Sequence, residues 1–268
     1  MRHLKIAILL FASVLLLASC ANKKKKQAEL EIKKGEIEKV MMDYVYPLPS
    51  SFELMEMLNE IEAAFIIGIS NSPEDVSRYA TSPKQAMNLG VFLTDLSYAS
   101  IYNRKQAAQD YLVACEELIR ELHVDDAFEE GFFNHISENI DDRDALVELV
   151  STATQEVYGN FYRKGDQDLA YLMVAGAWTE AMYLTLIVSD NTPLNQQIIN
   201  TIIFQHKSLI ETINLLEEVE GKPGVNPVLT ALKGVKNTFD KEDPSALTVD
   251  QVDTLKTQIE ALRAHVVE

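Results

Sequence analysis

Two acidic residues stand inside stretches of the sequence that otherwise carry no charge. Asp95 is the single charged residue of the stretch 86–101, and Glu180 is the single charged residue of the stretch 169–189. An ionised carboxylate in an apolar interior is costly, so it must find hydrogen-bond donors or a cation, or take up a proton. We therefore expect each of these two acids to have a specific partner in the folded protein.

Tyrosines stand one helical turn from each acid. Tyr98 follows Asp95 and Tyr183 follows Glu180 at a spacing of three residues, and Tyr102 falls on the same helix face as Asp95. If the two helices meet, these five side chains line a shared polar pocket able to hold a cationic or hydroxylated small molecule. The alternative, which we favour, is a satisfied buried network that fixes how the helices pack.

The surroundings of the two acids are also similar to each other. The residues 94–98 read Thr-Asp-Leu-Ser-Tyr, and 85 positions later the residues 179–183 read Thr-Glu-Ala-Met-Tyr. Both stretches are apolar all round the helix axis, which is typical of central helices covered by others. Each is followed by an amphipathic helix, so the pattern indicates a duplicated helical hairpin.

Apolar residues recur at helical spacing along most of the chain, and no segment alternates like a convincing strand. Short connections between the helices predict antiparallel neighbours. The predicted fold is therefore an all-α, antiparallel bundle of about nine to ten helices, with two related hairpin halves around two central apolar helices. The expected helices cover 28–44, 51–69, 83–101, 104–122, 126–139, 142–163, 167–189, 193–220, 227–237 and 249–266.

Local signals set some boundaries of these helices. The residues 50–53 and 248–251 resemble capping boxes, and Gly165 is placed to end a helix. The Gly-Lys-Pro-Gly run that begins at residue 221 is the clearest break in the chain. We predict one bundle domain over 28–220, with the C-terminal helices of 221–268 packed against it as an appendage.

The N-terminus reads as a secretory signal of residues 1–19. A basic head is followed by an unbroken apolar stretch over 6–17 and then by small residues, and the run is too short to span a bilayer. The ending Leu-Ala-Ser-Cys resembles the lipobox of bacterial lipoproteins. That resemblance implies that Cys20 carries the lipid, that 20–27 is a lysine-rich tether, and that the cell envelope is the compartment. Ala21 in place of an aspartate favours the outer membrane, on its periplasmic face or at the cell surface.

The charge of the chain excludes one class of partner. The chain has 24 basic and 41 acidic residues, for a net charge of −17, and residues 27–268 alone carry 18 against 41, or −23. Such a surface argues against nucleic-acid binding, which requires a positive face. The lysines of 23–26 can lie on anionic headgroups or serve only as a solvated spacer.

The sequence lacks the common catalytic and metal-binding motifs. His135 and Glu138 have helical spacing, but the chain has no HExxH and no Glu-x-x-His pair, no CxxCH, no phosphate-binding loop and no nucleophile elbow. We therefore expect no enzyme activity, no metal and no cofactor.

Cys115 lies in an apolar helical stretch and is predicted to be buried and inert. The acids at 141–144 are expected to be helix caps.

A further resemblance covers less than a tenth of the chain. The residues 86–91, Ala-Met-Asn-Leu-Gly-Val, and 95–99, Asp-Leu-Ser-Tyr-Ala, are similar to a segment of uncharacterised all-helical lipoproteins of Bacteroidetes-type bacteria. That family implies no activity and no site residues.

The function that these features predict is a lipid-anchored, non-catalytic binding or scaffold module. It is expected to act as an accessory to an envelope protein complex. The alternatives are a small-ligand receptor that uses the five side chains named above, and an unrecognised hydrolase built on the two acids.

Overall fold

The computed structural model of the chain describes residues 51–60, 63–190, 196–240 and 247–268, all within one compact unit. Cys20, the tether and the predicted helix 28–44 lie outside the described residues. The described part is all-α and has no strand, which confirms the predicted fold class. Its elements are α2 (Ser51–Glu60), η2 (Pro73–Arg78), α3 (Ser82–Ile101), α4 (Lys105–Glu121), η3 (Asp125–Ala127), α5 (Phe132–Glu138), α6 (Arg143–Lys164), α7 (Gln167–Asp190), α8 (Gln196–Glu218), α9 (Val225–Phe239) and α10 (Val249–Val267).

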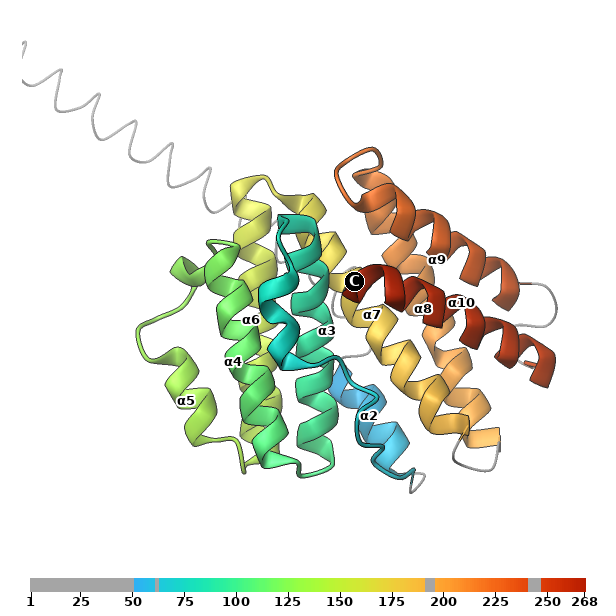
Figure 1. The fold of residues 1–268 in the computed structure, drawn as a ribbon, viewed down its shortest axis with the longest axis horizontal. Helices are drawn as coiled ribbons and strands as arrows, with labels where there is room; N and C mark the ends of the chain where they lie inside the picture. Colours follow the sequence, from blue (N-terminus) through green and yellow to red (C-terminus); the bar gives the residue numbers. More distant parts are fainter. Residues whose placement is uncertain (1–50, 61–62, 191–195, 241–246) are drawn as a thin grey trace, which may run out of the picture. The chain divides into compact units, whose positions relative to one another are not determined.

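The two predicted central helices, α3 and α7, are the core of this unit. They pack along each other, with α4 and α6 on one side and with α8 and α10 on the other (Figure 1). Every residue of 85–101 in α3 is buried. Of the helices in the described ranges, α7 alone has the length and composition to cross a bilayer, but 83% of that stretch is buried in the bundle. Its apolar surface is therefore covered by neighbouring helices.

Glycines let the central helices touch backbone to backbone. A Cβ on Gly90 would lie 2.0 Å from the carbonyl oxygen of Met173, and a Cβ on Gly176 would lie 2.0 Å from that of Met87. No side chain fits at either position, so these glycines set the closest approach of α3 and α7. The contact is reciprocal, and both glycines follow a methionine by three residues. This similarity supports the predicted duplication, which stays a prediction.

Hydrogen bonds fix both ends of the last helix, α10. The predicted capping box is confirmed, because Thr248 and Gln251 bond to each other's backbone at the start of α10. At the other end, Asn88 of α3 donates to the carbonyl oxygen of Val266 at 2.9 Å, and Lys84 donates to that of His265. Side chains of α3 thus satisfy carbonyls in the last turn of α10. The division at residue 220 stays a prediction, but α10 contributes directly to the interior around α3 and α7.

The expected helix 51–69 is wrong over its second half. Residues 63–81, which we call the strap, run without α-helix across α3 and include only the short η2. Gly68 has a φ of 83°, a left-handed conformation that a helix does not use. The physical reason is tertiary: side chains of α3 and α10 bond the backbone groups that a helix would have paired internally.

The expected helix 126–139 is also shorter than predicted. It is divided into η3 and α5 by Gly131, whose φ is 87°. By contrast, Asp142 accepts from the amide of Ala145 at 3.1 Å and caps α6, as the acids at 141–144 led us to expect. Gly165 ends α6 in the left-handed conformation, which is also confirmed.

Candidate functional site

Asp95 and Glu180 meet at the centre of the bundle. They project from α3 and α7 just beyond the glycine crossing, and neither side chain is exposed to solvent. Burial, and after it the neighbouring Glu180 carboxylate, raise the pKa of Asp95 well above its ordinary value. Burial also raises the pKa of Glu180, although Arg263 opposes this change. The two acids that the sequence singles out therefore lie together in the interior.

Arg263 of α10 is the cation that the acids need. Its Nε donates to Glu180 Oε2 at 2.6 Å, and its Nη2 donates to Oε1 at 2.9 Å, which is the paired geometry of a guanidinium on a carboxylate. Nη2 also donates to the carbonyl oxygen of Ile69 in the strap at 3.2 Å. The guanidinium carbon lies 4.0 Å from the centre of the Tyr183 ring. The predicted residue Tyr183 thus contacts the site through this arginine.

Asp95 is bound mainly by the strap. Its Oδ2 accepts from the amide of Asn71 at 3.1 Å, and the nearby Ser70 side chain acts to lower the pKa of the carboxyl group. Its Oδ1 is buried and has no donor among the described groups, while the Asp95 carboxyl contacts Glu180. When two carboxyl groups face one guanidinium, the carboxyl that is not paired with it keeps a proton more easily. We therefore assign a proton to Asp95, which donates it toward Glu180.

Tyr98 and Tyr102 have a different task. Tyr98 Oη accepts from the amide of Ile66 at 2.9 Å, and Tyr102 Oη donates to the carbonyl oxygen of Ala63 at 2.8 Å. The ring of Phe65 stacks on that of Tyr98, with centroids 4.8 Å apart. Burial raises the pKa of Tyr102 to about 12, so its hydroxyl stays protonated and able to donate. These tyrosines hold the strap, and their hydroxyls bond its backbone instead of the acids.

Sequence reasoning missed three members of this network: Arg263, Ser70 and Asn71. A signal for Arg263 was present, because it stands four residues after Ile259 and three before Val266, both of which are buried. A cation in the apolar stripe of one helix matches unpaired acids in the apolar stretches of two others. Nothing in the sequence marked Ser70 or Asn71, which act through a loop whose path depends on the tertiary fold.

The described part of the chain has a pocket beside this network, of about 660 Å³. It lies between the strap, the end of α3 and the start of α4. Of the five predicted ligand-binding residues only Tyr98 lines it; Asp95, Glu180, Tyr102 and Tyr183 do not. Its lining residues are Phe65, Ile66, Ile67, Gly68, Ser70, Ser72, Tyr98, Ala99, Arg104, Lys105, Gln106, Ala107 and Tyr111.

Ser70 lies between the pocket and the interior. Its side chain acts on the pKa of both Asp95 and Tyr111, and Tyr111 stands in the pocket wall although it is only 7% exposed. A molecule that enters the pocket therefore reaches the outer edge of the network. The acids themselves lie behind Ser70 and Asn71, out of reach of solvent.

Other reactive groups in the described ranges are separate from this site. Cys115 is buried in α4 as predicted, and burial raises the pKa of its thiol. His206 bonds Asp240 at 2.9 Å at the end of α9. Within the residues described, no three His, Cys, Asp or Glu side chains gather as metal ligands would.

Comparisons of the chain with protein-family models, with curated proteins and with solved structures found no match.

Proposed function

We propose that this chain is a lipid-anchored, non-catalytic binding module of the bacterial cell envelope. In this proposal Cys20 carries the lipid, the outer membrane holds the protein, and the helical unit binds a partner in an envelope complex. The lipobox-like ending before Cys20 supports the anchor. With membrane attachment left to several acyl chains, the folded surface is free to bind something else.

The use made of the two central acids supports binding over catalysis. A general acid or base must come within hydrogen-bond reach of a substrate. Asp95 and Glu180 are fully buried and are committed to Arg263, to Asn71 and to each other. This arrangement suits residues that fix three helices and the strap in one geometry. It also disfavours the hydrolase alternative, which depended on the same acids.

Two experiments test the proposal in turn. Metabolic labelling with a palmitate analogue is expected to mark the wild-type protein and not its Cys20→Ser variant. Labelled protein solubilised from envelopes is then used as bait, beside an unrelated lipoprotein of similar size and charge. We expect a partner protein to be recovered in constant proportion with this bait and not with the unrelated lipoprotein. An unlabelled wild-type protein contradicts the anchor, and recovery of the same proteins by both baits contradicts the complex.

A second candidate is a small-ligand receptor, which the pocket favours. A volume of about 660 Å³ lies in the range of ordinary ligand sites, and its lining combines apolar rings with a few polar groups. A thermal-shift screen across amines, sugars, amino acids and organic acids tests this candidate. A saturable rise in melting temperature for one chemical class is expected, whereas no rise for any class contradicts the receptor.

A further inference from the structure

The charge of the pocket is the opposite of that of the chain. Residues 27–268 carry 41 acidic against 18 basic side chains, yet the pocket lining includes Arg104 and Lys105 and no acid. The acids of α4 begin at Asp110, beyond the residues of its first turn that line the pocket. A basic recess in so acidic a chain concentrates anions and repels cations.

Arg104 is an uncommitted cation. Its guanidinium carbon lies 4.7 Å from the centre of the Phe65 ring, and no carboxylate of the described residues is within ion-pair distance. Lys105, by contrast, pairs with Asp141. Four of the other five arginines in the described part have such a pair: Arg78, Arg143, Arg163 and Arg263. Arg104 therefore presents its donors to whatever enters the pocket.

The start of α4 adds donors at the same place. Arg104 is the N-cap residue, and no side chain caps the helix there. The first-turn residues of 105–107 all line the pocket. The first amides of a helix have no partner within it and favour a negative group. An oxyanion beside Arg104 would gain from both sources.

The rest of the lining suits an apolar or planar body. Phe65, Tyr98 and Tyr111 contribute ring surfaces, and Ser70 and Ser72 contribute hydroxyls. Ile67, at the edge of the pocket, is 87% exposed and offers additional apolar surface. A ligand with a charged head and a ring body would contact every part of this lining.

We infer that this pocket binds a small organic anion, with a carboxylate or phosphate head at Arg104 and the start of α4 and an apolar or aromatic body against Phe65 and Tyr111. The inference rests on the small-ligand form of the proposed function. It also reverses the ligand charge expected from the sequence, because the acids that suggested a cationic ligand are sealed behind Ser70.

Calorimetric titration of the full lipidated protein in neutral detergent tests the inference with four probes that each join a phenyl ring to a different head group. These are phenylpropionate, phenyl phosphate, phenylpropanol and phenylpropylamine. Saturable binding is expected for one or both anions, which identifies the preferred head group. The alcohol and the amine are expected not to saturate at the same concentrations. Binding of the anions is also expected to weaken as salt is added.

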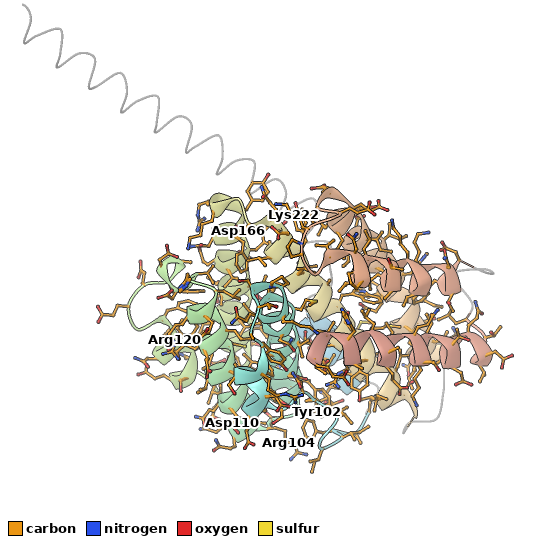
Figure 2. All side chains as sticks on the ribbon, turned by 45° about the horizontal axis from the view of Figure 1, so that its top comes forward. Tyr102, Arg104, Asp110, Arg120, Asp166 and Lys222 are labelled. Atoms are coloured by element: carbon orange, nitrogen blue, oxygen red, sulfur yellow. The ribbon has the colours of Figure 1, made fainter. Side chains whose placement is uncertain are left out.

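Arg104→Gln is the variant that removes the charge, and Arg120→Gln is its matched control. Both arginines are exposed on or next to α4, about 24 Å apart along the helix, and Figure 2 shows them well separated. Losing hydrogen bonds to a charged head is expected to weaken anion binding about tenfold or more in Arg104→Gln, with no change in Arg120→Gln. Ala107→Phe, which fills the pocket without changing its charge, is expected to abolish binding.

The outcomes separate this inference from the function on which it rests. If the amine or the alcohol binds as well as the anions, the receptor stands and the anion inference is overturned. The same conclusion follows if the anions bind with equal affinity to Arg104→Gln. If none of the four probes saturates and the thermal-shift screen is also silent, both the inference and the receptor fail.

Discussion

The acid network and the pocket lie on the two sides of Ser70, yet they are built in opposite ways. The network joins ionisable groups from three helices that are far apart in the sequence: Asp95, Glu180 and Arg263. It is almost entirely buried, and nearly every donor and acceptor in it is committed. The pocket is assembled from the single stretch 65–111, is open to solvent, and keeps Arg104 uncommitted. The first arrangement is suited to hold the fold, and the second to bind a molecule.

This difference implies that the two central acids do not mark the proposed ligand site. The two acids stood out in the sequence because their surroundings are apolar, and burial is the common cause of both features. The charge that points to a binding site in this acidic chain is a basic side chain with no acid beside it, which is Arg104. The following changes test whether the two regions are as separate as this comparison implies.

Arg263→Met is expected to have the largest effect on folding. It leaves two buried carboxyls without a cation and removes the bond to the carbonyl oxygen of Ile69. Breaking a buried ion pair by removing one partner typically costs about 3–5 kcal/mol, and we expect a loss of that order in the free energy of unfolding. Chemical denaturation measures it. Glu180→Gln combined with Arg263→Met should recover part of the loss, and a double variant as unstable as Arg263→Met alone would contradict the pairing.

Gly90→Ala is expected to come next, and Gly234→Ala is its control. The added methyl of the first would lie 2.0 Å from a backbone oxygen of α7, whereas that of the second would meet nothing closer than 4.0 Å. Overpacking at such a contact costs about 1–3 kcal/mol or more. Alanine at an open helical position gains up to about 1 kcal/mol over glycine. Gly90→Ala should therefore lower the stability measured by thermal and chemical unfolding, and Gly234→Ala should raise it. Equal changes in the two variants would mean that the crossing of α3 and α7 is not tight.

The parts of the fold that sequence alone predicted are those set by local pattern. The capping box of Thr248 and Gln251, the stop at Gly165 and the two central helices all followed from spacing. The strap did not, because its apolar residues have helical spacing while its backbone bonds are made to Tyr98 and Tyr102. A competition between internal and tertiary hydrogen bonds is decided by partners that local pattern does not reveal.

The site was predictable to the same extent. The acids themselves demanded a partner, and its identity required knowing that α10 crosses both central helices. The pocket was not predictable, since Arg104 has no unusual neighbours in the sequence. Only the fold brings it over Phe65 and away from any described carboxylate.

The shared proton of the acid pair predicts a dependence of stability on pH. The pKa of Asp95 is about 4 in the unfolded chain, and burial raises it well above that value in the folded protein. Its contribution to stability is therefore complete below pH about 4 and is lost as pH rises through the folded pKa. Asp95→Asn has no such proton, and its amide can still accept from Asn71 and donate to Glu180. Its stability relative to wild type is expected to rise between pH 4 and pH 8.

Asp95→Ala is the contrasting variant in that experiment. It leaves the buried amide of Asn71 without its acceptor, and we expect it to lower the free energy of unfolding by about 1–3 kcal/mol at low pH. Denaturation at a series of pH values follows both variants. If the difference between Asp95→Asn and wild type stays constant with pH, Asp95 is ionised in the folded protein and the shared proton is wrong.

Arg104→Gln is expected to have the smallest effect on folding. Arg104 is exposed, and its contact with the ring of Phe65 is worth about 0.5–1 kcal/mol at such a site. Denaturation of this variant beside Arg120→Gln measures the difference. A loss within that range would leave Arg104 free to serve a ligand, since the fold does not depend on it. A loss as large as that of Arg263→Met would place Arg104 within the structural network, and the distinction between the two sides of Ser70 would then fail.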